Sequence, residues 1–439
     1  MDVALPKPEM QSGTAGLSSA ATLRYGLMGF ALAFVALPLY VLLPHYYAAN
    51  FGLPLATLGF LLLGGRLLDA LLDPLLGRGI NHLLHRSPAQ SLSWAAAAAL
   101  VLAVGFAGLW FPLWTQGDAL LVNLSISLLL TYLAFSALTI GHQSWGALLG
   151  GHEVQRARIV AWREGLGLAG VLVASVAGTL WDMWISVALL WLALPLAWWG
   201  WRSGPQPALA PQQPVTVEVA AEVAAEARGP QPMADPAFRA LLAVFMLNGI
   251  ASALPATLML FFVQDLLQAP ASMQALFLGA YFVCGALGMG VWLALVARWG
   301  LLRSWLVGML LACAVFSFAA TLGPGDAWGY AAVCAASGLA LGSDLALPSA
   351  MLAGITLRAR QTHGAQEGAY FGWWACATKL NLALAAGLAL PALAAWGYAP
   401  GAQDPQALRA LTWAYCLLPC GLKLAAAGLL FFFHSRKTL

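Results

Sequence analysis

The chain has 439 residues, of which 61% are hydrophobic and only 8% are charged, and its net charge is +3. Because a soluble globular protein carries about 25% charged residues, this composition excludes a water-soluble fold. Long continuous apolar runs also argue against a membrane β-barrel, whose strands alternate apolar and polar residues over about ten positions. We therefore predict an all-α protein that crosses a lipid bilayer many times.

Apolar runs separated by turn residues predict twelve membrane-spanning helices, which need roughly 20 residues each. In chain order they cover residues 22–46, 54–82, 91–112, 118–148, 158–180, 183–201, 237–264, 272–298, 302–322, 327–354, 368–396 and 406–432. The first 21 residues are rich in Pro, Gly, Ser and Ala and lack the pattern of a signal peptide. We expect a cytoplasmic tail there.

The longest polar stretch divides the helices into two groups of six. The predicted parts are an N-terminal tail (1–21), an N-terminal bundle (22–201), a cytoplasmic linker (202–235), a C-terminal bundle (236–433) and a C-terminal tail (434–439). The tripeptide Arg-Ala-Arg follows the fourth helix at 156–158 and recurs after the tenth at 358–360. Two related bundles with a site between them near mid-membrane are typical of secondary transporters.

Basic residues are distributed unequally between the two sides of the predicted bundle. Fifteen of the 20 Lys and Arg residues flank the helices on the side of the linker, namely Lys7, Arg24, Arg78, Arg86, Arg156, Arg158, Arg202, Arg228, Arg239, Arg298, Arg303, Arg358, Arg360, Arg436 and Lys437. The opposite loops hold Arg409 and several aspartates. Because basic loops stay in the cytoplasm, we expect both termini there and the protein in a bacterial inner membrane.

The second predicted helix carries charged residues inside an apolar span. Arg66, Asp69 and Asp73 follow one another at intervals of three and four residues, which places them on one helical face. A charge at the bilayer centre costs at least about 2.5 to 3.5 kcal/mol on insertion scales, so such residues are candidates for function. Two carboxylates offer oxygen ligands for a small cation or a shared proton. The alternative is an Arg66–Asp69 ion pair that only joins helices.

The fourth predicted helix concentrates hydrogen-bonding groups in its second half, at Ser136, Thr139, His142 and Gln143. Ser136 and Thr139 offer hydroxyl oxygens, whereas His142 and Gln143 are candidates for binding a polar solute. His142 is also able to carry a proton near neutral pH. A buried histidine satisfied by a neighbouring helix is the alternative.

The C-terminal half holds three further polar candidates. Lys379 lies about eleven residues into the eleventh helix, or about 16 Å deep at roughly 1.5 Å per residue, which is too deep for its ammonium to reach water easily. That depth suits contact with Asp69, Asp73 or an anionic solute, although a purely structural cation is the alternative. Asp344 belongs to the charge network, and Asn248 lines the cavity or bridges helices.

The remaining motifs argue against other chemistry. The six cysteines lie in apolar segments, and neither a His-Glu-x-x-His nor a Gly-x-Ser-x-Gly motif is present. We expect a monomer that is not an enzyme, with no cofactor, no nucleic-acid partner and no metal beyond a transported sodium ion.

The sequence Arg-x-x-Asp-Ala-x-x-Asp-Pro at residues 66–74 resembles the glycoside-pentoside-hexuronide:cation symporters, the melibiose-permease-like branch of the major facilitator superfamily. The resemblance covers nearly the whole transmembrane region. It implies that Asp69 and Asp73 bind the coupling cation together with the hydroxyl of Ser136. It also matches Arg163 to a basic residue at the sugar site and Lys379 to the family's lysine in the eleventh helix.

Some positions differ from that family. Where its sugar transporters have aspartates in the first and fourth helices, this chain has Ala31 and Thr139, and Gln143 replaces an aromatic residue near the sugar. The acidic residues beyond the tenth helix are absent around Gly354. A galactoside is therefore not the expected solute.

Together these features predict a sodium- or proton-coupled symporter of a small polar organic solute, a sugar or sugar acid, working by alternating access in the bilayer. The candidate solute ligands are Arg163, His142, Gln143, Thr139, Lys379 and Asn248, with Arg66 and Asp344 in the charge network. A lipid or amphiphile carrier is the alternative, because the sugar-binding carboxylates are lost and the chain has 19 tryptophans. A membrane-embedded enzyme or an assembly factor is a more distant alternative.

Overall fold

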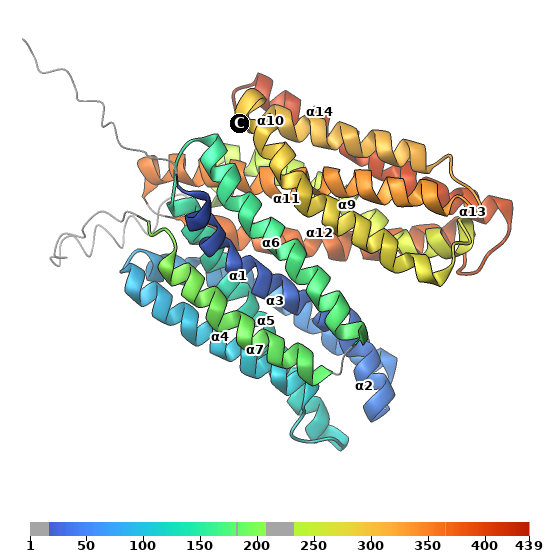
Figure 1. Cartoon of the computed structure of the whole chain (residues 1–439), viewed down its shortest axis with the longest axis horizontal. Helices are drawn as coiled ribbons and strands as arrows, with labels where there is room; N and C mark the ends of the chain where they lie inside the picture. The colour runs from blue at the N-terminus through green and yellow to red at the C-terminus, as the bar shows by residue number, and fades with distance from the viewer. Residues whose placement is uncertain (1–16, 181–182, 208–231, 365, 439) are drawn as a thin grey trace, which may run out of the picture.

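The computed structural model describes residues 17–180, 183–207, 232–364 and 366–438, and the regular elements in these ranges are helical (Figure 1). The N-terminal half contains α1 (Ser19–Leu37), η1 (Pro38–Leu42), α2 (Leu43–Phe51), α3 (Leu55–Leu84), α4 (Pro88–Trp110), α5 (Gly117–Leu148), α6 (Glu153–Leu180) and α7 (Met183–Ser203). The C-terminal half contains η2 (Pro232–Ala234), α9 (Pro236–Phe261), η3 (Phe262–Leu266), η4 (Ala271–Met273), α10 (Gln274–Ala319), α11 (Ala327–His363), α12 (Glu367–Ala395), α13 (Pro405–Thr412), η5 (Trp413–Leu417) and α14 (Leu418–Ser435). The predicted all-α fold is confirmed. Most of the predicted N-terminal tail and linker lies outside the described residues.

The helices are long enough to account for twelve membrane spans. Among the residues that the structure describes, ten helical segments are long and apolar enough to cross a bilayer, and α3 adds a further helix of 30 residues. The 46 residues of α10 form two helices that meet at Gly300, where φ is 79°. Glycine adopts this backbone conformation readily, so the helices predicted at 272–298 and 302–322 join at one residue instead of through a loop.

Three helices begin with the same N-cap arrangement, a capping side chain followed by proline. Ser87, Asp235 and Asp404 each accept a hydrogen bond from a backbone N–H in the first turn of the helix that follows, at distances of 3.1, 2.9 and 3.1 Å. A proline stands directly after each cap. Its fixed φ suits the first helical position, and its missing N–H would have no helical partner there. The sequence pairs Ser-Pro and Asp-Pro therefore fix the starts of α4, α9 and α13.

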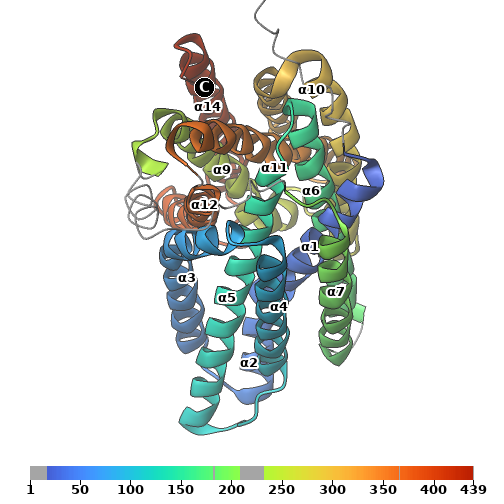
Figure 2. The ribbon, with the colours of Figure 1, turned by 90° about the vertical axis from the view of Figure 1, so that its left-hand side faces the viewer.

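The helices form two bundles, α1–α7 and α9–α14, which meet at one end and diverge toward α2 and α13 (Figure 1). We call the end that carries Ser19, Ser203, Pro236 and Ser435 the linker end, and the opposite one the far end. Figure 2 shows α12 of the second bundle, seen nearly end-on, next to the upper end of α3 of the first, and these two helices are in contact. The two bundles are therefore joined mainly toward the linker end.

Polar contacts at the linker end connect the bundles directly. Glu153, in the first turn of α6, accepts a hydrogen bond at 3.0 Å from the backbone N–H of Leu301, where the second helix of α10 begins. The backbone N–H of Gly368 donates to Asn81 at 3.1 Å. His85 lies 3.0 Å from Glu367. Breaking these contacts is required before the linker end can open.

Glycines allow the backbones of α3 and α12 to touch. A methyl group on Gly77 would overlap the backbone carbonyl of Gly368, and one on Gly372 would lie 2.5 Å from the backbone oxygen of Asp73. Small residues of this kind let membrane helices approach closely and gain dispersion energy. The two helices are consequently fixed in register close to the charged residues of α3.

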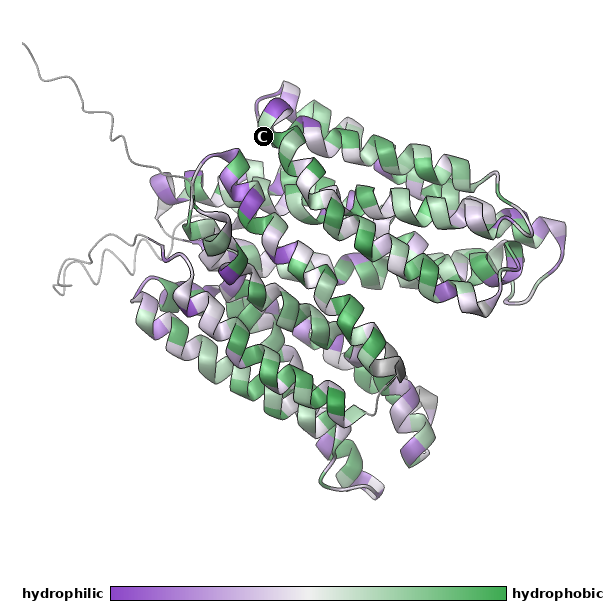
Figure 3. Ribbon diagram, in the orientation of Figure 1, coloured by the Kyte–Doolittle hydropathy of each residue, from purple (hydrophilic) through white to green (hydrophobic). Residues whose placement is uncertain are grey.

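Hydrophobic residues predominate along the helices, while hydrophilic residues gather toward the helix ends (Figure 3). On α3 the side chains of Leu67, Leu71 and Leu75 are exposed, whereas Asp69 and Asp73 are buried. This arrangement suits a helix with one lipid-facing side and one side that faces protein. The charged face therefore points inward, as the sequence required.

The close packing of α3 against α12 gives a prediction for stability. Gly77→Val should destabilise the fold by about 1–3 kcal/mol, because overpacked contacts force neighbouring groups apart. Gly79→Val is the matched control, since a side chain there would enter open space. Melting temperatures of the purified variants in detergent measure the difference. Equal melting temperatures for the two variants would show that the close approach is not required.

Candidate functional site

The centre of the site is Lys379, which connects α12 of the second bundle to α3 of the first. Its Nζ atom lies 2.6 Å from Asp69 Oδ2 and 2.7 Å from Asp73 Oδ2, and it donates to Asp73 Oδ1 at 2.8 Å. The two aspartates are 2% and 0% exposed. One ammonium group thus bridges two buried carboxylates across the interface between the bundles.

Ser136 on α5 completes this cluster. Its hydroxyl donates to Asp69 Oδ1 at 2.6 Å and accepts a bond from Lys379 Nζ at 2.6 Å. The four side chains bring together one ammonium, one hydroxyl and two carboxylates, so with both carboxylates ionised their summed charge is negative. A cluster with excess negative charge in a low-dielectric surround favours uptake of a cation or a proton.

Local sequence explains why these groups meet. Asp69 and Asp73 are one helical turn apart on α3 and therefore share a face. Gly372 lies against the backbone of Asp73, and Lys379 follows it two turns later on α12. Arg66 lies on α3 one turn before Asp69 and is half-buried.

Two further candidates on α5 have polar atoms without hydrogen-bond partners. Thr139 Oγ1 and Gln143 Oε1 are buried and unpartnered within the described chain. Ser136, Thr139 and Gln143 are spaced by three and four residues, so they line one face of α5. Unmet hydrogen-bonding capacity on the same face as the charged cluster is what a polar solute requires.

Arg163 lies on α6 and is 6% exposed. Its guanidinium forms an ion pair with the neighbouring Glu164. Arg163 and Gln143 line a closed space of about 10 Å³ together with Ser349 and Phe371 of the second bundle. Such a space is about the size of one water molecule, and Phe371 places it nearer the linker end than Lys379.

His142 occupies a different face of α5 from that row. It is completely buried, its Nε2 lies 2.9 Å from the backbone oxygen of Tyr25, and its ring stacks on Tyr25 with centroids 4.1 Å apart. The ring also meets Trp201 edge-on at 4.8 Å. These contacts favour the alternative expected from sequence, a buried histidine held by neighbouring helices, although its Nδ1 has no hydrogen-bond partner among the described residues.

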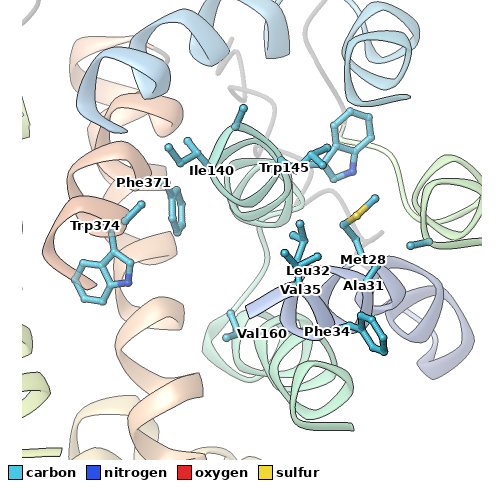
Figure 4. Close-up of a cluster of buried hydrophobic side chains, with 14 of the residues drawn as sticks. Met28, Ala31, Leu32, Phe34, Val35, Ile140, Trp145, Val160, Phe371 and Trp374 are labelled. Carbon is cyan, nitrogen blue, oxygen red and sulfur yellow. The ribbon is translucent and has the colours of Figure 1, made fainter. Parts of the chain in front are cut away.

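Figure 4 shows the apolar packing around α1, where Ala31 lies among Met28, Leu32 and Phe34. Ala31 is fully buried. The position at which the resemblance to sugar symporters implied an aspartate therefore belongs to the hydrophobic core of this chain.

A second charged cluster lies entirely within the C-terminal bundle and was not predicted. Lys423 on α14 donates to Asp344 at 2.7 Å, to Asn248 at 2.9 Å and to Ser252 at 2.8 Å. Asp344 also accepts bonds from Ser252 at 3.0 Å and from Trp305 at 3.0 Å. The structure thus places Asn248 and Asp344 together, in a cluster separate from that of Lys379.

The two clusters differ in charge. Each of the three ammonium protons of Lys423 has an acceptor, and the single carboxylate of Asp344 balances its charge. Lys379 instead faces two carboxylates. The second cluster is consequently neutral and satisfied, whereas the first retains capacity for another positive charge. The sequence did contain a signal for the second cluster. Lys423 lies in the middle of the apolar stretch 416–430, as Lys379 lies in the middle of its own helix.

Comparison with known proteins agrees with this architecture. Residues 23–436 match the family described as MFS/sugar transport protein. The chain belongs to that family. It is a multi-pass membrane transporter of the major facilitator superfamily rather than an enzyme, and it acts on a small-molecule substrate within the lipid bilayer. No curated protein matches its sequence.

Solved structures share the transporter's fold at low identity. A bacterial homologue of the iron transporter ferroportin, in an outward-facing state, has a TM-score of 0.67 at 16% identity, covering 96% of this chain and 100% of that chain. The E. coli fucose:proton symporter FucP has a TM-score of 0.61 at 15% identity, covering 93% and 98%. The human organic anion transporter MFSD10 has a TM-score of 0.60 at 18% identity, covering 94% and 98%.

The neutral cluster gives a prediction for stability. Lys423→Met should cost about 3 kcal/mol, because it leaves the Asp344 carboxylate, which is only 12% exposed, without its counter-charge. Adding Asp344→Asn should restore most of the loss, since no unpaired charge then remains. Lys437→Met, at an exposed position, is the control for loss of a positive charge. Thermal unfolding in detergent tests this, and a double variant no more stable than Lys423→Met would contradict it.

Proposed function

We propose that this transporter is a cation-coupled symporter of the glycoside-pentoside-hexuronide:cation branch. The observation that carries the proposal is the sharing of Lys379 between Asp69 and Asp73 at the bundle interface. An ion pair that only joined helices would need one carboxylate. The second one gives an arriving sodium ion or proton a partner, with the Ser136 hydroxyl as a further oxygen ligand.

Competition for the carboxylates supplies the coupling. In the empty carrier Lys379 holds both aspartates. A cation that binds them displaces the ammonium, which then has to find another anionic or polar partner because it lies deep between the helices. A solute bound beside α12 provides that partner. Cation and solute then raise each other's affinity by the same factor, as linkage requires.

The solute site lies next to this cluster in the proposal. Thr139 and Gln143 offer their unpartnered polar atoms, and Arg163 contributes a cation near the linker end of the same face. We leave His142 and Asn248 out of it, because the His142 ring packs against Tyr25 and Trp201 of the N-terminal bundle and Asn248 accepts a hydrogen bond from Lys423. A small polar organic molecule with hydroxyl or carboxylate groups, such as a sugar or sugar acid, suits these residues.

The bundles predicted at 22–201 and 236–433 move as the two units of alternating access in this proposal. With the linker end in the cytoplasm, as the basic residues indicate, contacts such as Glu153 to Leu301 close the cytoplasmic side. Solute and cation then enter from the far end. Opening of the linker end releases both into the cytoplasm.

An amphiphile carrier remains the second candidate, and the burial of Ala31 in the apolar core favours it over a galactoside carrier. Thermal-shift measurements with sugars, sugar acids and lysolipids, each with and without sodium and at two pH values, separate the candidates. Sodium- or proton-dependent stabilisation by a polar solute supports symport. Stabilisation by lysolipid alone would favour the amphiphile carrier.

The first functional prediction concerns the cation site. Asp73→Asn should abolish cation-driven solute accumulation while the protein still folds, because an amide replaces the carboxylate at nearly constant volume. Asp118→Asn, at an exposed position in the first turn of α5, should transport normally. Uptake into proteoliposomes with an imposed cation gradient is the measurement. Normal accumulation by Asp73→Asn would refute the proposed cation role.

The second concerns coupling. Lys379→Met should remove the effect of the cation on solute affinity, because no shared ammonium then links the two ligands. Lys379→Met leaves two carboxylates without a counter-charge and is able to destabilise the fold. The double variant Lys379→Met/Asp69→Asn removes one of these charges and is measured beside it. Solute binding is measured with and without the cation in each protein. Unchanged coupling would leave Lys379 as a structural cation only.

A further inference from the structure

A separate cavity of about 370 Å³ lies between the bundles at the linker end. Its walls come from the start of α6, the start of the second helix of α10, the end of α11 and the end of α14. Its volume falls within the roughly 300–1,000 Å³ typical of ligand sites. None of the residues of the Lys379 cluster lines it.

The charges around this cavity favour an anion. Arg156 and Arg358 line it from opposite bundles, and His434 adds a third nitrogen base. The one carboxylate in its wall belongs to Glu153, which already accepts the bond from the backbone N–H of Leu301. The two guanidinium groups therefore outnumber the acidic groups that could neutralise them.

Arg156 has a donor without an acceptor. Its Nη1 donates to the backbone oxygen of Gly151 at 2.8 Å, but its buried Nε has no hydrogen-bond partner within the described residues. Its guanidinium lies against Gly354, where even a methyl group would be 3.0 Å from Nη2. Because Gly354 has no side chain, the Arg156 guanidinium packs directly against the backbone of α11. Its Nε–H is available to a ligand.

The rest of the wall is apolar. Leu301, Leu302 and Ile355 line the cavity beside the arginines. Basic residues above an apolar floor, at the level where the helices of a membrane protein end, are typical of sites for the phosphate of an anionic lipid. Arginine forms bidentate, charge-assisted bonds with phosphate oxygens.

We propose that this cavity binds a phosphate group, carried by an anionic phospholipid or present as free phosphate. The group bridges Arg156 on α6 and Arg358 on α11. Because these residues belong to different bundles, the bound anion stabilises the closed linker end and slows its opening. This regulatory site is independent of the proposed cation coupling.

The test uses purified full-length protein in detergent and follows thermal unfolding. In the first arm, phosphatidylglycerol is added, and phosphatidylcholine with the same acyl chains is the control without net charge. In the second arm, sodium phosphate is added, and sodium chloride at the same ionic strength is the control. We expect a higher melting temperature with phosphatidylglycerol or phosphate, and a response confined to one arm identifies which source supplies the group.

Two variants locate the effect. Arg358→Gln, at an exposed position that should not disturb folding, should weaken the apparent affinity about tenfold or more through loss of a charge-assisted bond. Arg303→Gln removes a charge at the same end, outside the cavity, and should leave the affinity unchanged. The proposal is overturned if neither phosphate source stabilises the protein, or if Arg358→Gln and Arg303→Gln respond alike.

Discussion

The need to balance a lysine ammonium deep between the two bundles organises the centre of this transporter. The Lys379 side chain is only 12% exposed, and its counter-charges come from the opposite bundle. Asp69 and Asp73 supply them, and Ser136 fills the remaining position. The glycines that bring α3 and α12 into backbone contact hold these groups within bonding distance. Packing and electrostatics at the interface are therefore two parts of one constraint.

A second enclosed lysine, Lys423, obtains its counter-charge in a different way. Lys423 finds all its partners on helices of its own bundle, and one carboxylate balances its charge. That arrangement needs no movement between bundles, so it suits a rigid body. The Lys379 cluster spans the interface between the bundles and contains one carboxylate more than its ammonium balances. The two lysine clusters therefore differ in charge balance more than in burial.

Much of the fold could be predicted because membrane spans are long apolar runs, and the helix count followed from them. The join at Gly300 was not predicted, since a single glycine with positive φ replaces a loop. The residues of the Lys379 cluster were identified because charges are rare in apolar helices. The depth of Lys379 also predicted its contact with Asp69 or Asp73, but the sharing of one ammonium by both carboxylates could not be derived, because it depends on how α3 and α12 pack.

Residue spacing did contain information about His142. Ser136, Thr139 and Gln143 repeat at helical intervals on one face of α5, whereas His142 falls outside that row and turns toward Tyr25 and Trp201. The prediction treated these four residues as one site because they are close in sequence, but His142 lies in a different environment from the other three. Lys423 was overlooked, although the depth criterion that identified Lys379 applies equally to a lysine in the middle of an apolar stretch.

The hydrogen bond between Glu153 and Leu301 has a consequence for the resting carrier. A residue of one bundle acts as the N-terminal cap of a helix in the other, so that helix is capped only while the linker end is shut. Such caps contribute about 0.5–2 kcal/mol, which corresponds to a roughly 2- to 30-fold preference in population. The helix start therefore adds a small but definite preference for the closed linker end.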